Sequence, residues 1–464
     1  MIERRPSPPA GGLSCPDLTE PLTRRRLTTY GVGSVGTAVF ATVPGLLLLY
    51  YLTDVLGVAA GLAGLVVALP KLWDVIFNPI VGAVSDREAV RTGRRTVLLL
   101  WGAISLPVLF TAMFLSPFTG AAGAAWVAVV FVLASSAYAL FQVPYVGLPA
   151  EMAAGADART RVTARRVIYL TIGILLGGGI APVLAATAGG GRGGYVVMGV
   201  VVGVLMLGAL VTAALGTRWV RSSPGQSLRL IAAVRSARGN RPFFALLTVY
   251  ITQAVAVAIM LAAAPYIATY WLGGHGMTSV LFICLVAPSA LAIPVWERLA
   301  RRFGRLRCYV AATVGYAAGA LLLLPGIALG GPIPALILIA LLGIGYAALQ
   351  LLSLALLPDT VLADADRTGQ TQAGTFTGLW TAGETAGMAI GPGLFSVALA
   401  VSGYAATTWD APVAQSGGAK LGMLLGFTVA PALLMLVSLP ALRAFARTRT
   451  PEPAAPRLDS ALEG

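Results

Sequence analysis

Apolar segments of about 20 residues, the length that a helix needs to cross a hydrocarbon core about 30 Å thick, recur along the whole of this chain. The chain has 464 residues, of which 57% are hydrophobic and only 11% are charged. A soluble protein of this size needs far more polar surface. The sequence therefore predicts an all-α polytopic membrane protein.

The apolar segments predict twelve transmembrane helices in two pseudo-symmetric six-helix halves. The helices are expected at 29–53, 59–84, 96–117, 122–147, 162–187, 194–217, 243–271, 277–296, 307–329, 333–357, 372–401 and 419–442. The domain boundaries follow as a disordered cytoplasmic N-terminus 1–26, an N-terminal half 27–217, a cytoplasmic central loop 218–242, a C-terminal half 243–443 and a disordered cytoplasmic tail 444–464.

The net charge of +14 is concentrated in alternate loops, which argues for membrane topology and against nucleic-acid binding. Arginines gather on one side of the predicted topology, at 24–26, 87–95, 159–166, 218–241, 298–307 and 443–449. The opposite side shows only Arg192 and Lys420. Loops rich in Lys and Arg stay in the cytoplasm. Both termini of this multi-pass cell-membrane protein are therefore expected to be cytoplasmic.

The sequence offers little for enzymatic, metal or cofactor chemistry. Cys15, Cys284 and Cys308 are too scattered for a disulfide framework or a metal site, and His275 is the only histidine. The glycine-rich segment 189–194 lacks the Lys-Ser/Thr of a phosphate-binding loop. We therefore expect no enzyme activity, no cofactor and no ATP hydrolysis, so a gradient must supply any driving force.

A short pattern of an acid, arginines and a glycine occurs twice with identical spacing. The matched positions are Asp86, Arg87, Arg91, Gly93 and Arg94 after the second helix, and Glu297, Arg298, Arg302, Gly304 and Arg305 after the eighth. Glu151 after the fourth helix and Asp359 after the tenth form a second echo. Two similar halves of six helices are the plan of major facilitator transporters.

The repeated pattern suits a cytoplasmic gate. Its charges can pair with helix ends and with the other half, and such pairs hold one access state closed until they break. The two states of a transporter differ by a few kcal/mol, which a ligand can shift. A loop charge that only sets topology is the alternative for either copy alone, and the paired spacing favours the gate.

Several motifs resemble the glycoside–pentoside–hexuronide cation symporters of the major facilitator superfamily, whose best-known member is melibiose permease. They are the segment 50–57 (YYLTDVLG), Trp73-Asp74, Asn78-Pro79, Pro144-Tyr145, Leu148-Pro149 and Gly378-Leu379-Trp380. The resemblance extends from about residue 28 to about residue 440. It implies sugar-symporter-like transport by alternating access, and its motifs say little about the substrate.

Ionisable residues inside the membrane are candidates for coupling, because they are costly there. Lys71 and Asp74 share a face of the second helix with Asn78, and Glu384 lies in the eleventh helix. The alternative for Lys71 and Asp74 is a local pair that only neutralises itself. In the family, the positions of Asp74 and Asn78 resemble two carboxylates that bind the coupling cation. Because Asn78 carries no charge, we expect proton coupling at Asp74 or Glu384 in place of sodium coupling.

The candidate substrate contacts also depart from the family pattern. Its sugar-binding acids align with Ala38 and Gln142, and its lysine aligns with Glu384, whereas Arg166 is retained. Gln142, Tyr145, Arg166 and Trp380 are the candidate substrate-binding residues, each with a packing role as the alternative. A less hydroxylated, amphiphilic or cationic solute therefore suits the cavity as well as a glycoside.

The leading function is gradient-driven transport of a small organic solute by a monomer in contact with membrane lipids. Its partners are a small-molecule substrate and a coupling cation, a proton or else sodium. The alternatives are proton-driven efflux of drug-like or amphiphilic compounds and a membrane sensor that does not transport. Two intact halves with charges in the cavity argue against the sensor.

The topology can be tested by labelling single cysteines from outside the cell. An impermeant reagent should miss cysteines placed in the loop 218–241 and should reach a cysteine placed at His275, because arginines hold the loop in the cytoplasm. The opposite labelling pattern would overturn the predicted orientation.

Overall fold

The structure is a computed structural model that describes residues 23–153, 156–221, 239–368 and 373–448. Most of the two predicted disordered ends lies outside these ranges, but residues 24–26 and 444–448 belong to the first and last helices, where the sequence predicted disorder. Most of the predicted central loop also lies outside them. The described residues form helices and connecting segments, with isolated β-bridges but no named strand.

The described residues of the N-terminal half form seven α-helices and three short π-helical segments. They are α1 (Arg24–Val43), η1 (Pro44–Leu48), η2 (Tyr51–Val55), α2 (Ala60–Thr92), α3 (Thr96–Phe114), α4 (Gly120–Met152), α5 (Ala156–Leu175), η3 (Leu176–Ile180), α6 (Ala181–Thr187) and α7 (Arg192–Gly216). The C-terminal half contains α9 (Arg241–Tyr270), α10 (Met277–Phe303), α11 (Arg305–Ala328), α12 (Pro332–Thr368), α13 (Ala373–Val401) and α14 (Gly417–Thr448).

Twelve segments of the described chain are long and apolar enough to cross a membrane, and the predicted twelve-helix fold is confirmed. The first span joins α1 to η1, and the fifth joins α5, η3 and α6. Helices α2, α10 and α12 continue well past their predicted ends, to Thr92, Phe303 and Thr368. Hydropathy locates the apolar part of a helix, whereas the backbone hydrogen bonds of these three helices continue into their charged ends.

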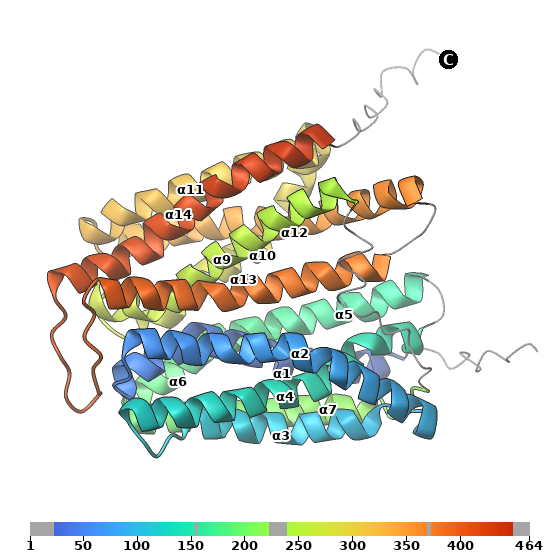
Figure 1. Ribbon diagram of the computed structural model, residues 1–464, viewed down its shortest axis with the longest axis horizontal. Helices are drawn as coiled ribbons and strands as arrows, with labels where there is room; N and C mark the ends of the chain where they lie inside the picture. The colour runs from blue at the N-terminus through green and yellow to red at the C-terminus, as the bar shows by residue number, and fades with distance from the viewer. Residues whose placement is uncertain (1–22, 154–155, 222–238, 369–372, 449–464) are drawn as a thin grey trace, which may run out of the picture.

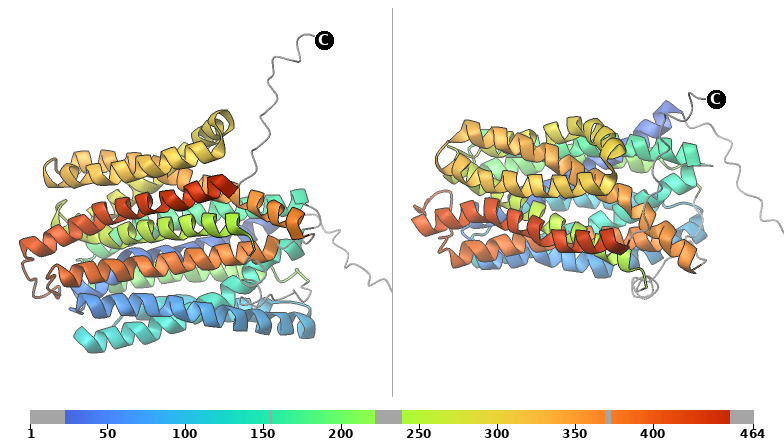
Figure 2. Two further views of the ribbon diagram at one scale, coloured as in Figure 1. Left: turned by 45° about the horizontal axis from the view of Figure 1, so that its top comes forward. Right: turned by 90° about the horizontal axis from the view of Figure 1, so that it is seen from above.

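The helices run along one direction, with the two halves lying side by side (Figures 1 and 2). Helix α2 packs against α13 where the halves meet, and α9 contacts η1. At one end of the bundle, the hairpin 402–416 connects α13 to α14 (Figure 1). We call this the hairpin end. The opposite end, where α1 begins and α14 finishes, is the termini end.

Small residues allow close packing between helices, as in other membrane proteins. Gly102 on α3 faces α4, and a Cβ there would lie 2.6 Å from the backbone nitrogen of Phe141 and 2.9 Å from the carbonyl oxygen of Ala137. Gly391 on α13 similarly faces Ala258 on α9. Glycine at these positions is therefore a packing requirement.

Gly102→Ala should lower the thermal unfolding temperature of the purified protein by several degrees. The new methyl group would meet the backbone of α4, and overpacking costs about 1–3 kcal/mol. Gly208→Ala on α7 is the matched control, because a Cβ there has nothing within 4 Å. Gly208→Ala should be neutral or stabilising, since alanine favours helix more than glycine does. Equal melting temperatures for the two variants would contradict this packing analysis.

Candidate functional site

Asp74, Arg166 and Glu384 lie near one tyrosine that sequence reasoning missed. Tyr138 on α4 lies within electrostatic range of Asp74 on α2, Arg166 on α5 and Glu384 on α13. Its ring stacks on Phe40 of α1, with 5.0 Å between the ring centroids. Tyr138 lies four residues before the predicted Gln142, so both share one face of α4. That spacing is the signal that could have found it.

Four of the predicted site residues hold buried polar atoms that have no hydrogen-bond partner within the described structure. These atoms are Asp74 Oδ1, Gln142 Oε1, Arg166 Nε and Trp380 Nε1. Buried polar atoms are usually hydrogen-bonded, because an unpaired one costs free energy. They come from helices of both halves, so this is the region where a polar solute would find donors and acceptors.

Glu384 lies against an aromatic wall formed within the C-terminal half. Its carboxyl group is beside the Tyr250 hydroxyl on α9. The Tyr250 ring stacks on Trp380, with 4.1 Å between centroids and 19° between planes. Trp380 and Glu384 are four residues apart on α13, which places both on the same face. The wall therefore presents a flat aromatic surface next to an acid.

Asp74 is 6% exposed, whereas Asn78, four residues later on α2, is exposed. Lys71 acts on Asp74 electrostatically. No ion pair joins these two residues in the described structure, and Asp74 Oδ1 keeps no hydrogen-bond partner there. This geometry argues against a self-neutralised local pair.

Tyr145 is fully buried and already bonded within the N-terminal half. Its hydroxyl group donates to the carbonyl oxygen of Tyr30 at 2.6 Å and lies 2.8 Å from Ser34 Oγ. Its ring stacks on Tyr30, and the Arg166 guanidinium carbon lies 6.0 Å from the ring centroid of Tyr145. The hydroxyl of Tyr145 is thus occupied, and we assign Tyr145 to the support of Arg166.

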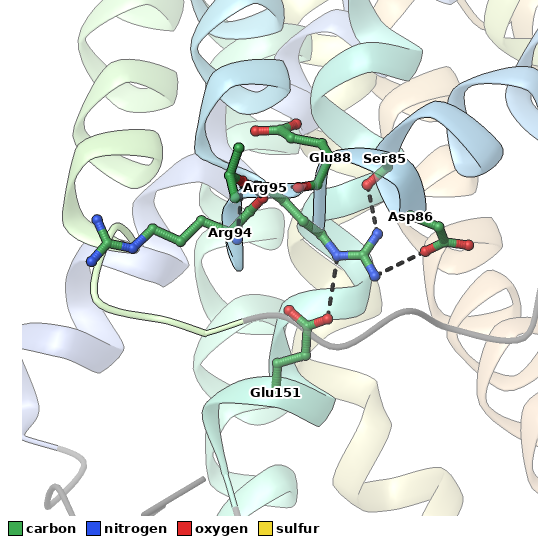
Figure 3. Close-up of polar contacts among 7 residues, drawn as sticks. Ser85, Asp86, Glu88, Arg94, Arg95 and Glu151 are labelled. Carbon is green, nitrogen blue, oxygen red and sulfur yellow. Dashed lines mark hydrogen bonds and ion pairs between the residues drawn. The ribbon is translucent and has the colours of Figure 1, made fainter. Parts of the chain in front are cut away.

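The gating motif of the N-terminal half centres on Arg95 (Figure 3). The Arg95 guanidinium pairs with Asp86 of α2 at 3.0 Å and with Glu151 of α4 at 3.2 Å, and it donates to Ser85 Oγ at 2.6 Å. The side chain of Arg94 is exposed and points away from these acids (Figure 3). Sequence reasoning chose Arg94 for this role, since the repeated spacing ends there, and missed the next residue.

The two copies of the motif share a glycine turn. Gly93 and Gly304 have φ values of 67° and 89°, in the region that favours glycine over residues with a Cβ. In the second copy, Arg305 donates to the carbonyl oxygen of Ala355 on α12 at 3.2 Å. Arg305 contacts α12 in the second copy, whereas in the first copy it is Arg95, one position after the matched Arg94, that contacts α4. Arg87, Glu297 and Arg298 are exposed.

The geometry of a central charged site between two helical halves agrees with the comparisons to known proteins. A family model described as MFS/sugar transport protein matches residues 29–448. The chain belongs to this family. Members of the major facilitator superfamily are transporters and not enzymes, so the chain is a multi-pass secondary transporter.

Curated relatives of the MFS/sugar transport chain are symporters and sulfonate-related transporters. An uncharacterised symporter of Synechocystis is 25% identical over 87% of this chain and 90% of its own length. A putative sulfoquinovose importer of Salmonella typhimurium is 24% identical over 78% of this chain and 78% of its own length. A putative glycoside/cation symporter of Escherichia coli is 29% identical, but over only 37% of each chain. These similarities confirm the predicted symporter family.

Solved structures share the fold. A bacterial homolog of the human lysosomal transporter Spinster has a TM-score of 0.66 at 14% identity and covers 93% of this chain and 98% of its own. The nucleoside transporter NupG has a TM-score of 0.60 at 12% identity and covers 92% of this chain and 99% of its own. At these identities the likeness shows the major facilitator fold alone.

Arg95→Ala should slow transport more than Arg94→Ala. Without the guanidinium, Asp86 and Glu151 lose the cation that both of them contact, and hydrogen bonds to charged groups are worth about 1.5–3 kcal/mol each. Initial uptake rates in vesicles, at equal expression, should fall on the order of tenfold or more for Arg95→Ala and Asp86→Ala. Equal rates for the wild type and the Arg95 variant would show that this ion pair does not govern gating.

Proposed function

We propose that this family member moves a small organic solute across the cytoplasmic membrane by alternating access, coupled to protons in preference to sodium. The observation that carries the proposal is the meeting of Asp74, Arg166 and Glu384 around Tyr138 where the two halves join. Charges are costly within a bilayer and mark ion and substrate pathways. The residues of this site come from both halves, so their distances change when the two halves move relative to each other. Binding of a solute or proton can therefore be coupled to the side of the membrane on which the site is open.

The ligands around Asp74 support a proton over sodium. Sodium needs several oxygens and net negative charge to replace its hydration shell. Asn78 is neutral and Lys71 lies one turn from Asp74. A proton needs only one carboxyl group in a buried site. Lys71 acts electrostatically on Asp74, so Glu384, beside Tyr250, is the better proton carrier of the two acids.

We assign Gln142, Arg166 and Trp380 to the solute, because each has an unbonded buried polar atom at this site. The stacked Trp380–Tyr250 wall suits a flat or apolar face of the solute, and Arg166 suits an acceptor group. Relatives include a putative sulfoquinovose importer and a putative 2,3-dihydroxypropane-1-sulfonate exporter. Measurements of uptake and of efflux in vesicles distinguish import from export for this chain.

We further propose that the termini end faces the cytoplasm and that the chain works as a monomer. Arginine-rich segments lie at the termini end, whereas Arg192 and Lys420 begin helices at the hairpin end. The positive-inside rule then places the hairpin end outside. Hydrogen bonds from Tyr270 and Tyr404 to Asp54 join the two halves at the hairpin end. With this orientation, the structure corresponds to a state closed to the outside.

Glu384→Gln should abolish pH-driven accumulation while leaving downhill exchange measurable. The amide cannot bind a proton, but the solute can still trigger the conformational switch. A thermal-shift screen of sugars, sulfonates and amphiphiles first identifies a solute that binds. Its accumulation is then measured in proteoliposomes under separate proton and sodium gradients.

Thr385→Val is the matched control, since the Thr385 hydroxyl donates to the carbonyl oxygen of Thr381 within its own helix. This variant should keep the response to pH. Accumulation that strictly requires sodium and ignores a pH gradient would refute proton coupling. It would show instead that Asp74 and Asn78 form a working sodium site.

A further inference from the structure

Asp54 is a buried carboxylate at the hairpin end that the proposed site does not use. It lies on η2, beyond Leu48, where the first membrane-spanning segment finishes. The residue is 3% exposed. No ion pair joins it to a basic residue that the structure describes. Removing a carboxylate from water without a nearby cation is costly unless hydrogen bonds replace the lost hydration.

Three hydroxyl groups donate to Asp54, and two of them come from the opposite half. Tyr270 of α9 donates to Oδ1 at 2.6 Å, and Tyr404 of the hairpin donates to Oδ2 at 2.6 Å. Thr53, the preceding residue, donates to Oδ2 at 2.6 Å. Such short bonds to a charged acceptor are stronger than neutral ones. The Asp54 carboxylate thus ties the N-terminal half to the C-terminal half.

Further contacts between the two halves surround the hydrogen bonds to Asp54. The Thr407 backbone nitrogen donates to the Thr53 carbonyl oxygen at 2.9 Å, and the Thr53 and Tyr266 hydroxyls lie 2.7 Å apart. Leu56 forms an antiparallel bridge with Thr408. The hairpin therefore sits on the end of the first helix. Opening this end must pull Tyr270 and Tyr404 away from Asp54 and admit water.

We propose that Asp54, Tyr270 and Tyr404 form a latch that closes the hairpin end, and that protonation of Asp54 favours the closed state. Closure moves the carboxyl group from water into a site that offers hydroxyl donors and no cation. Leaving water costs the ionised carboxylate more hydration free energy than it costs the neutral carboxyl group. The latch goes beyond the proposed function and takes from it only alternating access.

The direction of the pH effect follows from the two states. In the closed state, burial raises the pKa of Asp54 to about 6, against hydrogen bonds from Thr53, Tyr270 and Tyr404 that lower it. An aspartate in water has a pKa of about 3.9. Because the pKa is higher in the closed state, closure is favoured as the pH falls through 6. Between about pH 7.5 and about pH 5, the ratio of closed to open molecules should rise about tenfold.

Other titratable groups at this end are distinguishable from Asp54. His275 bonds through Nδ1 to the hydroxyls of Tyr50 and Thr269, and burial lowers the pKa of His275. Its protonation would therefore favour the open state, which is the opposite sign. The phenols that act on Asp54 titrate near pH 10 when unperturbed. They are Tyr50, Tyr195, Tyr266, Tyr270 and Tyr404. The charged residues elsewhere at this end are Arg192, Asp410 and Lys420.

The latch can be measured without a substrate, from the distance between two spin labels at the hairpin end. Phe118→Cys, between α3 and α4, and Leu329→Cys, between α11 and α12, place the labels at positions that are 50% and 88% exposed. The protein carries both changes in nanodiscs, with Cys15, Cys284 and Cys308 replaced by Ser. Acidification from about pH 7.5 to about pH 5 should increase the short-distance population relative to the long-distance one about tenfold.

The variants should move the two populations in opposite directions. Asp54→Asn is neutral at every pH, so it should hold the closed population of the acidified wild type and lose the pH response. Tyr404→Phe removes one donor from a buried charge, so it should lower the closed population on the order of tenfold at about pH 7.5. Acidification should restore much of that loss. Tyr51→Phe is the matched control, because its hydroxyl donates to the Phe114 carbonyl oxygen within the N-terminal half.

Three results would overturn the latch: no pH response in the wild type, a response of opposite sign, or an unchanged response in Asp54→Asn. If Asp54→Asn does not fold, the pH-dependent loss of closure in Tyr404→Phe decides the question. Failure of proton-driven accumulation together with an intact distance response would refute the proposed coupling at Glu384 and leave the latch standing.

Discussion

The absence of water from a bilayer core governs this structure, because every backbone polar group there must find a partner within the protein. Helices satisfy their own backbone bonds, which is why the described spans are helical. A helix does not provide hydrogen-bond partners for charged side chains in the same way. They are therefore few, and they gather where the halves meet or where the helices leave the apolar region.

Three groups of charges follow from this constraint. Asp74, Arg166 and Glu384 lie around Tyr138 between the halves. Arg95 joins the ends of α2 and α4 through Asp86 and Glu151. At the hairpin end, Asp54 takes hydroxyl donors from the opposite half. One group thus lies between the halves and one lies toward each end of the bundle.

The candidate site residues were easier to infer from the sequence than the residues that contact them. The unusual residues inside apolar segments are visible in the sequence, so Asp74, Arg166 and Glu384 could be chosen without a structure. Tyr250 was missed because an aromatic residue in an apolar helix has no distinguishing pattern, and Tyr138 was missed although its spacing of four residues from Gln142 places both on one face of α4. Asp54 was noticed only as part of a motif, since its donors Tyr270 and Tyr404 lie more than two hundred residues away in the chain.

The sequence by itself determined the twelve spans and the family. Each of these depends on local composition or on a short repeated pattern, which the chain carries whatever its tertiary packing. Only the tertiary structure decided that Arg95 and not Arg94 holds Asp86, that the Tyr145 hydroxyl is occupied, and that Asp54 bridges the halves. Those outcomes depend on the rotation and depth of one helix against another, and a change of one residue in position turns a side chain by about 100° around the helix.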